Sequence, residues 1–215
     1  MHRYTVSEIF GPTIQGEGMN AGRSCLFLRF SKCNLWPSPD KPSATYPWCD
    51  TPQLHRGEPM TQVDICRELG HLSSGQPQMG LVITGGESLL QLDEELLAPL
   101  ATMFPWIDVE TNGTIKPKFK VPRARVKLSV SPKTPKVLVQ PDWWKFLIPA
   151  KEDLLALTSW YDDRPIFLQP VEPLNEDGGS LDSLTYRKNV ERCVELAHKT
   201  GARVCLQLHK LLYLP

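Results

Sequence analysis

Residues 80–87 read Gly-Leu-Val-Ile-Thr-Gly-Gly-Glu, a short apolar run that stops at two glycines. A run of this length, bounded by turn residues, is typical of a strand that is buried on both faces. Helical patterns flank it at 61–72, where Thr61 is a suitable N-cap, and at 93–103, where Asp93 is one. A buried strand between two helices indicates a parallel sheet in an α/β fold.

The same alternation extends on both sides of this run. We expect further strands at 24–31, 106–110, 125–130, 143–148, 165–169 and 203–208, and further helices at 151–160 and 183–199. Because connections between parallel strands are right-handed, such a sheet either winds open or curls towards a barrel. The chain of 215 residues shows no internal repeat and is long enough for one domain with a sizeable core.

The composition narrows the classes of function. Lys and Arg together number 24, as do Asp and Glu, so the formal net charge is zero. This balance argues against a protein that coats nucleic acid or binds a membrane through basic residues. No apolar run approaches the roughly 20 residues that span a bilayer, and the N-terminal residues do not resemble a signal peptide. We therefore expect a cytoplasmic protein.

The stretch between Cys33 and Cys49 interrupts the pattern. It contains four prolines and no periodicity, and loops of this length are usually functional or disordered. The six cysteines of a cytoplasmic protein are better explained by metal ligation, redox chemistry or core packing than by disulfides. The patterns around Cys25, Cys66 and Cys193 favour core packing for these three.

Polar residues follow nearly every expected strand, at the end where parallel α/β folds bind ligands. They lie at 84–87, 110–112, 131–133 and 169–172, and at Gln207 and His209. Together they predict a wide ligand-binding opening, lined by polar side chains, along one edge of the sheet. Gly85 and Gly86 either let a ligand approach the backbone or simply form a strand-ending turn.

Arg29 lies late in the apolar stretch 24–31. A buried guanidinium needs a partner, and its fork of donors suits a carboxylate or a phosphate. The partner is therefore either a bound ligand or an acid of the chain itself, such as Glu110.

Several motifs together resemble those of the 7-carboxy-7-deazaguanine synthase family of radical S-adenosylmethionine (SAM) enzymes. These motifs are Thr13-Ile14-Gln15-Gly16-Glu17-Gly18, Cys33 with Trp48-Cys49-Asp50-Thr51, Thr84-Gly85-Gly86-Glu87, Glu110-Thr111-Asn112-Gly113, Ser129-Val130-Ser131-Pro132-Lys133 and Gln207-Leu208-His209-Lys210. The resemblance covers essentially the whole chain. The first motif in combination with Trp-Cys-Asp-Thr is highly specific, whereas Gly-Gly-Glu alone is common to radical SAM proteins.

The resemblance implies a single radical SAM domain over 1–215, with a modified, shortened (β/α) partial barrel and a cluster-binding loop at 33–51. It implies a homodimer that takes electrons from a donor such as flavodoxin. A 4Fe–4S cluster held by three cysteines would reduce SAM to a 5′-deoxyadenosyl radical, which abstracts hydrogen from 6-carboxy-5,6,7,8-tetrahydropterin. A Mg²⁺-assisted ring contraction by this carbon–nitrogen lyase would give 7-carboxy-7-deazaguanine and ammonia, towards queuosine and related deazapurines.

The resemblance also implies roles for individual residues. The implied substrate contacts are Ile14, Gln15, Gly16, Arg29, Thr84 and the terminal carboxylate of Pro215. The implied SAM contacts are Gly86, Glu87, Ser131, Pro132, Lys133, Gln169, Pro170, Val171 and Glu172. The implied metal ligands are Cys33 and Cys49 for the cluster and Thr51 for Mg²⁺, and the candidate catalytic residues are Glu17, Glu110 and His209.

The chain departs from the family pattern at Tyr46, which occupies an expected cysteine position. Four explanations are open. Tyr46 is a phenolate ligand, although iron–sulfur clusters prefer thiolates; another residue, such as His55 or Cys205, substitutes; the chain is a cluster-deficient, non-catalytic relative that binds a pterin or nucleotide; or the sequence is altered at this position. A different radical SAM reaction on the same scaffold is a further hypothesis.

Overall fold

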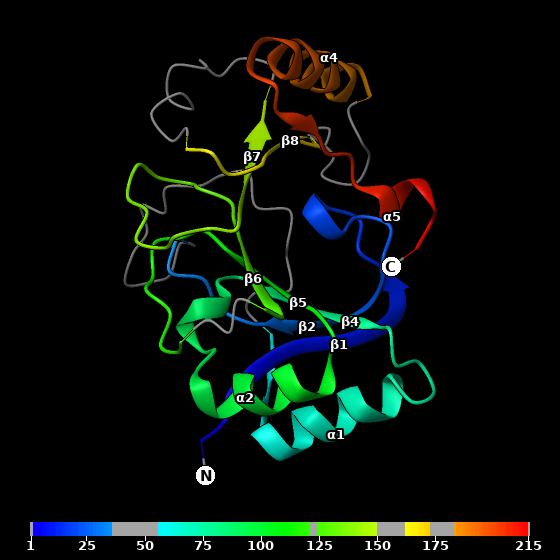
Figure 1. Cartoon of the computed structure of the whole chain (residues 1–215), viewed down its shortest axis with the longest axis vertical. Helices are drawn as coiled ribbons and strands as arrows, with labels where there is room; N and C mark the ends of the chain where they lie inside the picture. Colours follow the sequence, from blue (N-terminus) through cyan, green and yellow to red (C-terminus); the bar gives the residue numbers. More distant parts are fainter. Residues whose placement is uncertain (1, 36–55, 121–123, 150–161, 173–182, 215) are drawn as a thin grey trace.

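The computed structural model describes residues 2–35, 56–120, 124–149, 162–172 and 183–214 (Figure 1). Within these residues the chain forms one sheet of nine strands in the order β3-β1-β2-β4-β5-β6-β7-β8-β9. The strands are β1 (Tyr4–Ile14), β2 (Ser24–Phe30), β3 (Glu58–Met60), β4 (Gly80–Gly85), β5 (Ile107–Thr111), β6 (Val126–Val130), β7 (Trp143–Ile148), β8 (Ile166–Pro170) and β9 (Arg203–Val204). From β2 through β9 every neighbouring pair is parallel.

The helices cover the two ends of this sheet (Figure 1). The described helices are α1 (Gln62–Leu72), α2 (Glu94–Met103), α4 (Ser183–Thr200) and α5 (Leu208–Leu211), with 3₁₀ turns η1 (Gly18–Asn20) and η3 (Ser88–Leu90). Figure 1 places α1 and α2 side by side at one end and α4 at the other. No described helix is both long and apolar enough to span a bilayer.

Both predicted N-caps are confirmed. The side chain of Thr61 accepts a hydrogen bond from the backbone N–H of Asp64, and the Asp64 carboxylate accepts one from the backbone N–H of Thr61. This capping box satisfies two N–H groups at the helix start. Asp93 accepts from the N–H of Leu96 at the start of α2. The predicted helix at 151–160 lies outside the described residues.

Two strand predictions need correction. The sheet is not wholly parallel, because β1 pairs antiparallel with both β2 and β3. The last strand does not extend over 203–208 but ends at Val204. The N–H of Leu208 donates to the carbonyl of Gly16 at 3.0 Å instead of extending the ladder, and α5 begins there. Cys205, Gln207 and His209 therefore do not share one face of a strand.

Side chains alternate between the two faces of the sheet. On β2, Leu26, Leu28 and Phe30 belong to the main hydrophobic core, which also contains buried side chains of α1, α2 and α4. Cys25 and Arg29 lie on the opposite, concave face. The predicted core positions of Cys25 and Cys193 are confirmed, since both are fully buried. The helices thus pack on the face of the main core. The opposite face carries polar groups together with two small apolar clusters.

Candidate active site

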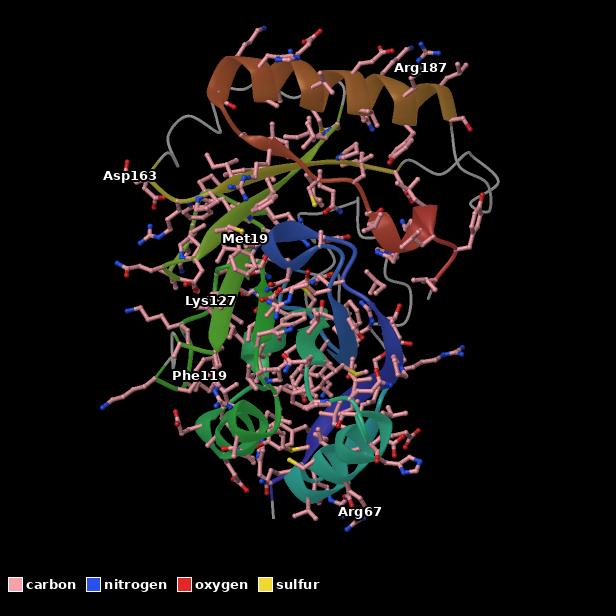
Figure 2. All side chains as sticks on the ribbon, turned by 45° about the vertical axis from the view of Figure 1, so that its right-hand side comes forward. Met19, Arg67, Phe119, Lys127, Asp163 and Arg187 are labelled. Atoms are coloured by element: carbon pink, nitrogen blue, oxygen red, sulfur yellow. The ribbon has the colours of Figure 1, made fainter. Side chains whose placement is uncertain are left out.

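The segment after β1 crosses the concave face and contacts strands at the far side of the sheet. The backbone N–H of Gly18 donates to Sγ of Cys205 at 3.1 Å, beside the last strand. Nδ2 of Asn20 donates to both carboxylate oxygens of Asp108 on β5, at 2.8 and 2.9 Å. In Figure 2, η1 with the labelled Met19 lies between the strands near α4 and those near α1 and α2. The segment thereby brings Glu17 into the centre of the concave face.

Glu17, Lys145 and Glu110 form a buried ion network at this centre. Nζ of Lys145, on β7, donates to Oε2 of Glu17 and, at 3.1 Å, to Oε1 of Glu110 on β5. Only 8% of the Lys145 side chain is exposed, against 13% for Glu17 and 21% for Glu110. The hydroxyl of Thr84 on β4 donates to Oε2 of Glu110 at 2.8 Å. Residues of β4, β5 and β7 thus join one network with Glu17.

Two glutamines complete the environment of Glu17. Nε2 of Gln169 and Nε2 of Gln207 donate to Oε1 of Glu17, at 3.1 and 2.7 Å. Burial would raise the pKa of Glu17, but the Lys145 ammonium outweighs it and lowers that pKa to about 2. Burial opposes the charge of Lys145 as well, yet the two carboxylates hold its pKa above the ordinary value. Glu17 and Lys145 are therefore both charged at neutral pH.

Gln15 and Gly16 support this arrangement from the end of β1. The side chain of Gln15 is buried, accepts from the N–H of Glu17 at 3.2 Å and hydrogen-bonds to Asp108. Burial raises the pKa of Asp108 to about 7, although the bonds from Asn20 oppose the shift. Ile14, the last residue of β1, is half-buried.

The His209 side chain packs directly on the backbone of Gly16. A Cβ on Gly16 would lie 1.9 Å from Nδ1 of His209, so only glycine leaves room for the imidazole. The carbonyl of Gly16 also holds the start of α5 through Leu208. Burial lowers the pKa of His209, although Glu17 opposes this. The chain then turns back, with the N–H of Leu214 donating to the carbonyl of His209 at 2.9 Å. Its terminal residue, 215, lies outside the described part of the chain.

Arg29 lies on β2, next in register to Thr84. Its Nε donates to Oε1 of Glu8 on β1 at 2.6 Å. The internal partner is therefore Glu8 and not Glu110, because antiparallel pairing places Glu8 directly opposite Arg29. The bond uses Nε, and the guanidinium retains two terminal amino groups that suit a ligand carboxylate.

The loop after β4 is held by its own glutamate. Glu87 is fully buried, and its carboxylate accepts from Thr111 Oγ1 at 2.6 Å, from the Asn112 N–H at 2.7 Å and from the Leu89 N–H at 3.0 Å. Burial raises the pKa of Glu87, while these donors oppose the shift. The carboxylate thus ties the loop to the end of β5.

The two glycines before Glu87 serve the turn. Gly85 has φ of +145°, and a Cβ there would lie 2.2 Å from the Phe30 carbonyl oxygen. A Cβ on Gly86 would lie 2.1 Å from the carbonyl oxygen of Lys32. The space beside both glycines is therefore filled by the end of β2 and the residues that follow it. This favours the strand-ending turn over an open approach for a ligand.

The remaining residues with implied SAM contacts lie just after β6 and at the end of β8 or just beyond it. Ser131 donates from Oγ to the Lys145 carbonyl and from its N–H to the Thr111 carbonyl, both at 2.8 Å. Gln169 is buried, and its Oε1 has no hydrogen-bond partner among the described residues. The other members are Pro132 and Lys133 after β6, Pro170 at the end of β8, Val171, whose N–H donates to the Ile148 carbonyl, and Glu172, which pairs with Lys210.

Only one of the implied cluster ligands is described. Cys33 is half-buried just after β2, and the N–H of Leu35 donates to its Sγ at 3.4 Å. Cys49, Tyr46, Thr51 and His55 lie outside the described residues, and within the described ranges no group of three or more metal-binding side chains occurs. Cys205 is buried with Trp143 and Phe167 in a small apolar cluster.

Sequence reasoning missed Lys145 and Glu8. Lys145 is the one charged residue in the apolar run 143–148, the same signal that singled out Arg29. Both lysine and arginine are costly to bury without partners, so a charge inside an apolar strand indicates acids nearby. Glu8 gave no such signal, because its pairing follows from the antiparallel register alone.

Known structures identify the fold. The crystal structure of QueE from Escherichia coli aligns with a TM-score of 0.71 over 96% of this chain and 95% of that one, at 23% identity. The mostly parallel sheet of this chain accordingly forms a modified, shortened (β/α) partial barrel.

Curated relatives identify the family. The 7-carboxy-7-deazaguanine synthases of Nitratidesulfovibrio vulgaris and Caulobacter vibrioides are each 34% identical to this chain, and that of Burkholderia multivorans is 33% identical. Each alignment covers 99% of both chains. No family model matches the chain. The chain belongs to the 7-carboxy-7-deazaguanine synthase family.

Proposed function

We propose that this protein converts 6-carboxy-5,6,7,8-tetrahydropterin into 7-carboxy-7-deazaguanine and ammonia, as a radical SAM carbon–nitrogen lyase. The observation that carries the proposal is the convergence of Glu17, Glu110 and His209 on one concave face. They come from the segment after β1, from β5 and from α5, three places whose motifs resemble those of the family. Net, the substrate loses one ammonia, so the reaction consumes no oxidant.

Substrate binding follows from the charges of this face. The 2-amino-4-oxopyrimidine edge of a pterin presents two N–H donors side by side, which a carboxylate can accept together. Glu110 is the most exposed member of the ion network and fits this role. Arg29 offers its terminal amino groups to the substrate carboxylate. His209, packed on Gly16, borders the same space.

The residues present are compatible with SAM. Gln169 carries a buried acceptor without a partner among the described residues, which a ligand N–H would satisfy. Glu87 fixes the turn after β4 by accepting a hydrogen bond from the N–H of Asn112. Ser131 links β5 to β7, because its N–H and its hydroxyl donate to backbone carbonyls of these two strands. SAM and a reduced iron–sulfur cluster, when bound, supply the hydrogen-atom abstraction that starts the ring contraction.

The cluster is proposed to bind at the loop 33–51 of a single radical SAM domain spanning 1–215. Cys33 fits as a ligand, because it is half-buried and its sulfur accepts an N–H bond that stabilises a thiolate. Cys49 and a third group, Tyr46 or His55, complete the proposed set, and Thr51 is the proposed Mg²⁺ ligand. The buried position of Cys205 in an apolar cluster argues against it as the third ligand.

The non-catalytic alternative is less favoured. A binding protein would have no need to keep a charged lysine buried between two acids, since such a network is costly to desolvate. We further propose that the enzyme is a cytoplasmic homodimer that takes electrons from a donor such as flavodoxin. The homodimer and the electron donor are carried over from the family resemblance.

The direct test is anaerobic turnover of the reconstituted protein with SAM, Mg²⁺, a reductant and the tetrahydropterin, followed by mass spectrometry of the products. We expect 7-carboxy-7-deazaguanine, and we expect none from Cys33→Ala. A folded, cluster-loaded protein that cleaves SAM but forms a different product would establish another radical SAM reaction. Tight pterin binding with no cluster and no turnover would establish the non-catalytic alternative.

A further inference from the structure

Lys145 is a largely buried basic residue of the concave face, and no role implied by the family motifs includes it. It lies in the middle of β7, between Trp144 and Phe146, whose side chains belong to the main core on the other face. Its residue surface is 7% exposed. An ammonium buried to this extent requires carboxylate partners, and Lys145 has two, Glu17 and Glu110.

The hydrogen bonds leave the two acids with different tasks. An ionised carboxylate has about four acceptor sites, two on each oxygen. Oε1 of Glu17 is used by two glutamine side chains, Gln169 and Gln207, and its Oε2 accepts from Lys145. Glu110 accepts one bond on each oxygen, from Lys145 and from Thr84. Within the described chain, Glu110 thus retains one acceptor site on each oxygen.

We propose that Lys145 is a positioning residue that holds Glu17 and Glu110 as a pair of ionised carboxylates, with the open oxygens of Glu110 available to the N–H donors of the substrate ring. The identity of that substrate rests on the proposed function. Glu17 acts in this arrangement as the second anchor of the lysine. It fixes the ammonium from the side of η1, and Glu110 fixes it from β5.

The physical reason is the repulsion between the two acids. Both contact the same nitrogen, so their carboxylates lie close together on a buried face. With the ammonium removed, burial and mutual repulsion favour uptake of a proton by one of them. A protonated Glu110 would present its own O–H to the ring and lose part of its acceptor capacity. Substrate binding would then require a higher pH.

The experiment measures anaerobic binding of 6-carboxy-5,6,7,8-tetrahydropterin by calorimetry, with the reconstituted, SAM-loaded protein, across the neutral pH range. The wild-type Kd is the reference at each pH, because Asp108 and His209 also interact with Glu110 and remain in every variant. In Lys145→Met the Kd should rise about tenfold at the acidic end, the equivalent of one hydrogen bond to a charged group, and recover as the pH rises. Lys145→Arg should restore most of the affinity. Lys127→Met, on neighbouring β6 where Lys127 pairs with Asp142, should behave as the wild type.

The outcomes are distinct. An equal loss of affinity for Lys145→Met at every pH would show a purely structural role and overturn the inference, as would unchanged affinity. If Lys145→Met does not fold, the double variant Lys145→Met/Glu17→Gln also removes one of the two carboxylates that repel each other. That double variant should fold and bind without the pH dependence, and a pH-dependent loss there would also refute the role. A wild-type protein that does not bind the pterin overturns the proposed function, and this inference with it.

Discussion

Replacing Glu87 by glutamine should destabilise the folded protein markedly, although the two side chains have the same shape. One carboxylate oxygen of Glu87 accepts from Thr111 Oγ1 and from the N–H of Leu89, and the other accepts from the N–H of Asn112. A glutamine can keep only one oxygen in this site. Its amide nitrogen then either faces the N–H of Asn112 or faces the first two donors.

The cost follows from these contacts. A bond to a charged acceptor contributes about 1.5–3 kcal/mol, and a buried donor left without a partner costs about 1–3 kcal/mol. In the better orientation the glutamine loses one such bond, to the backbone of Asn112, so we expect a loss of about 2–3 kcal/mol. For a chain of this size that corresponds to a Tm lower by roughly 4–12 °C. Glu87→Ala should cost more, because it removes all three bonds.

The assay is denaturant unfolding of the cluster-free protein, followed by circular dichroism. Glu68→Gln is the matched control, because Glu68 lies on the exposed face of α1. The control should leave the free energy of unfolding unchanged within error. If Glu87→Gln unfolds at the same denaturant concentration as this control, the carboxylate does not hold the turn after β4, and the reasoning about that turn is wrong.

Three further predictions concern other parts of the site. Gly16→Ala should displace the His209 imidazole, so we expect the pterin affinity measured by calorimetry to fall at least tenfold, with a much smaller change in Tm. An affinity equal to that of the wild type would refute the contact. The pKa of Asp108 is raised from 3.8 to about 7 in the folded state. Its contribution to the free energy of unfolding should therefore decline as the pH rises from 3.8 to about 7, and denaturation of Asp108→Asn at a series of pH values should lack this decline. Tyr46→Cys should raise the iron and sulfide retained after reconstitution, because thiolates are the better cluster ligands; unchanged contents would show that position 46 is not a ligand.

Most of the sheet could be predicted because its signals are local. The apolar runs that became β4 to β8 and the caps of α1 and α2 are each encoded within a few residues. The antiparallel pairing of β1 could not be predicted, since it depends on register with β2 and β3. The last strand was predicted too long, because the Leu208 N–H bonds to Gly16, which is distant in sequence.

The candidate site was predicted through its motifs and missed where charge pairs join distant segments. Glu17, Glu110 and His209 were named from the sequence, and the structure brings them to one face. Lys145 was missed, although it is the group that joins Glu17 to Glu110. Nothing in an apolar strand indicates which acids a single lysine will contact, because that depends on the curvature of the whole sheet.

The central claim is that this chain, with Tyr46 in an expected cysteine position, is a working radical SAM enzyme. Its most direct test is anaerobic iron–sulfur reconstitution, with iron and sulfide analysis and EPR of the reduced protein with and without SAM. We predict about four irons per chain and a reduced-cluster signal that changes on addition of SAM. A folded protein with little iron and no SAM-dependent signal would contradict the claim.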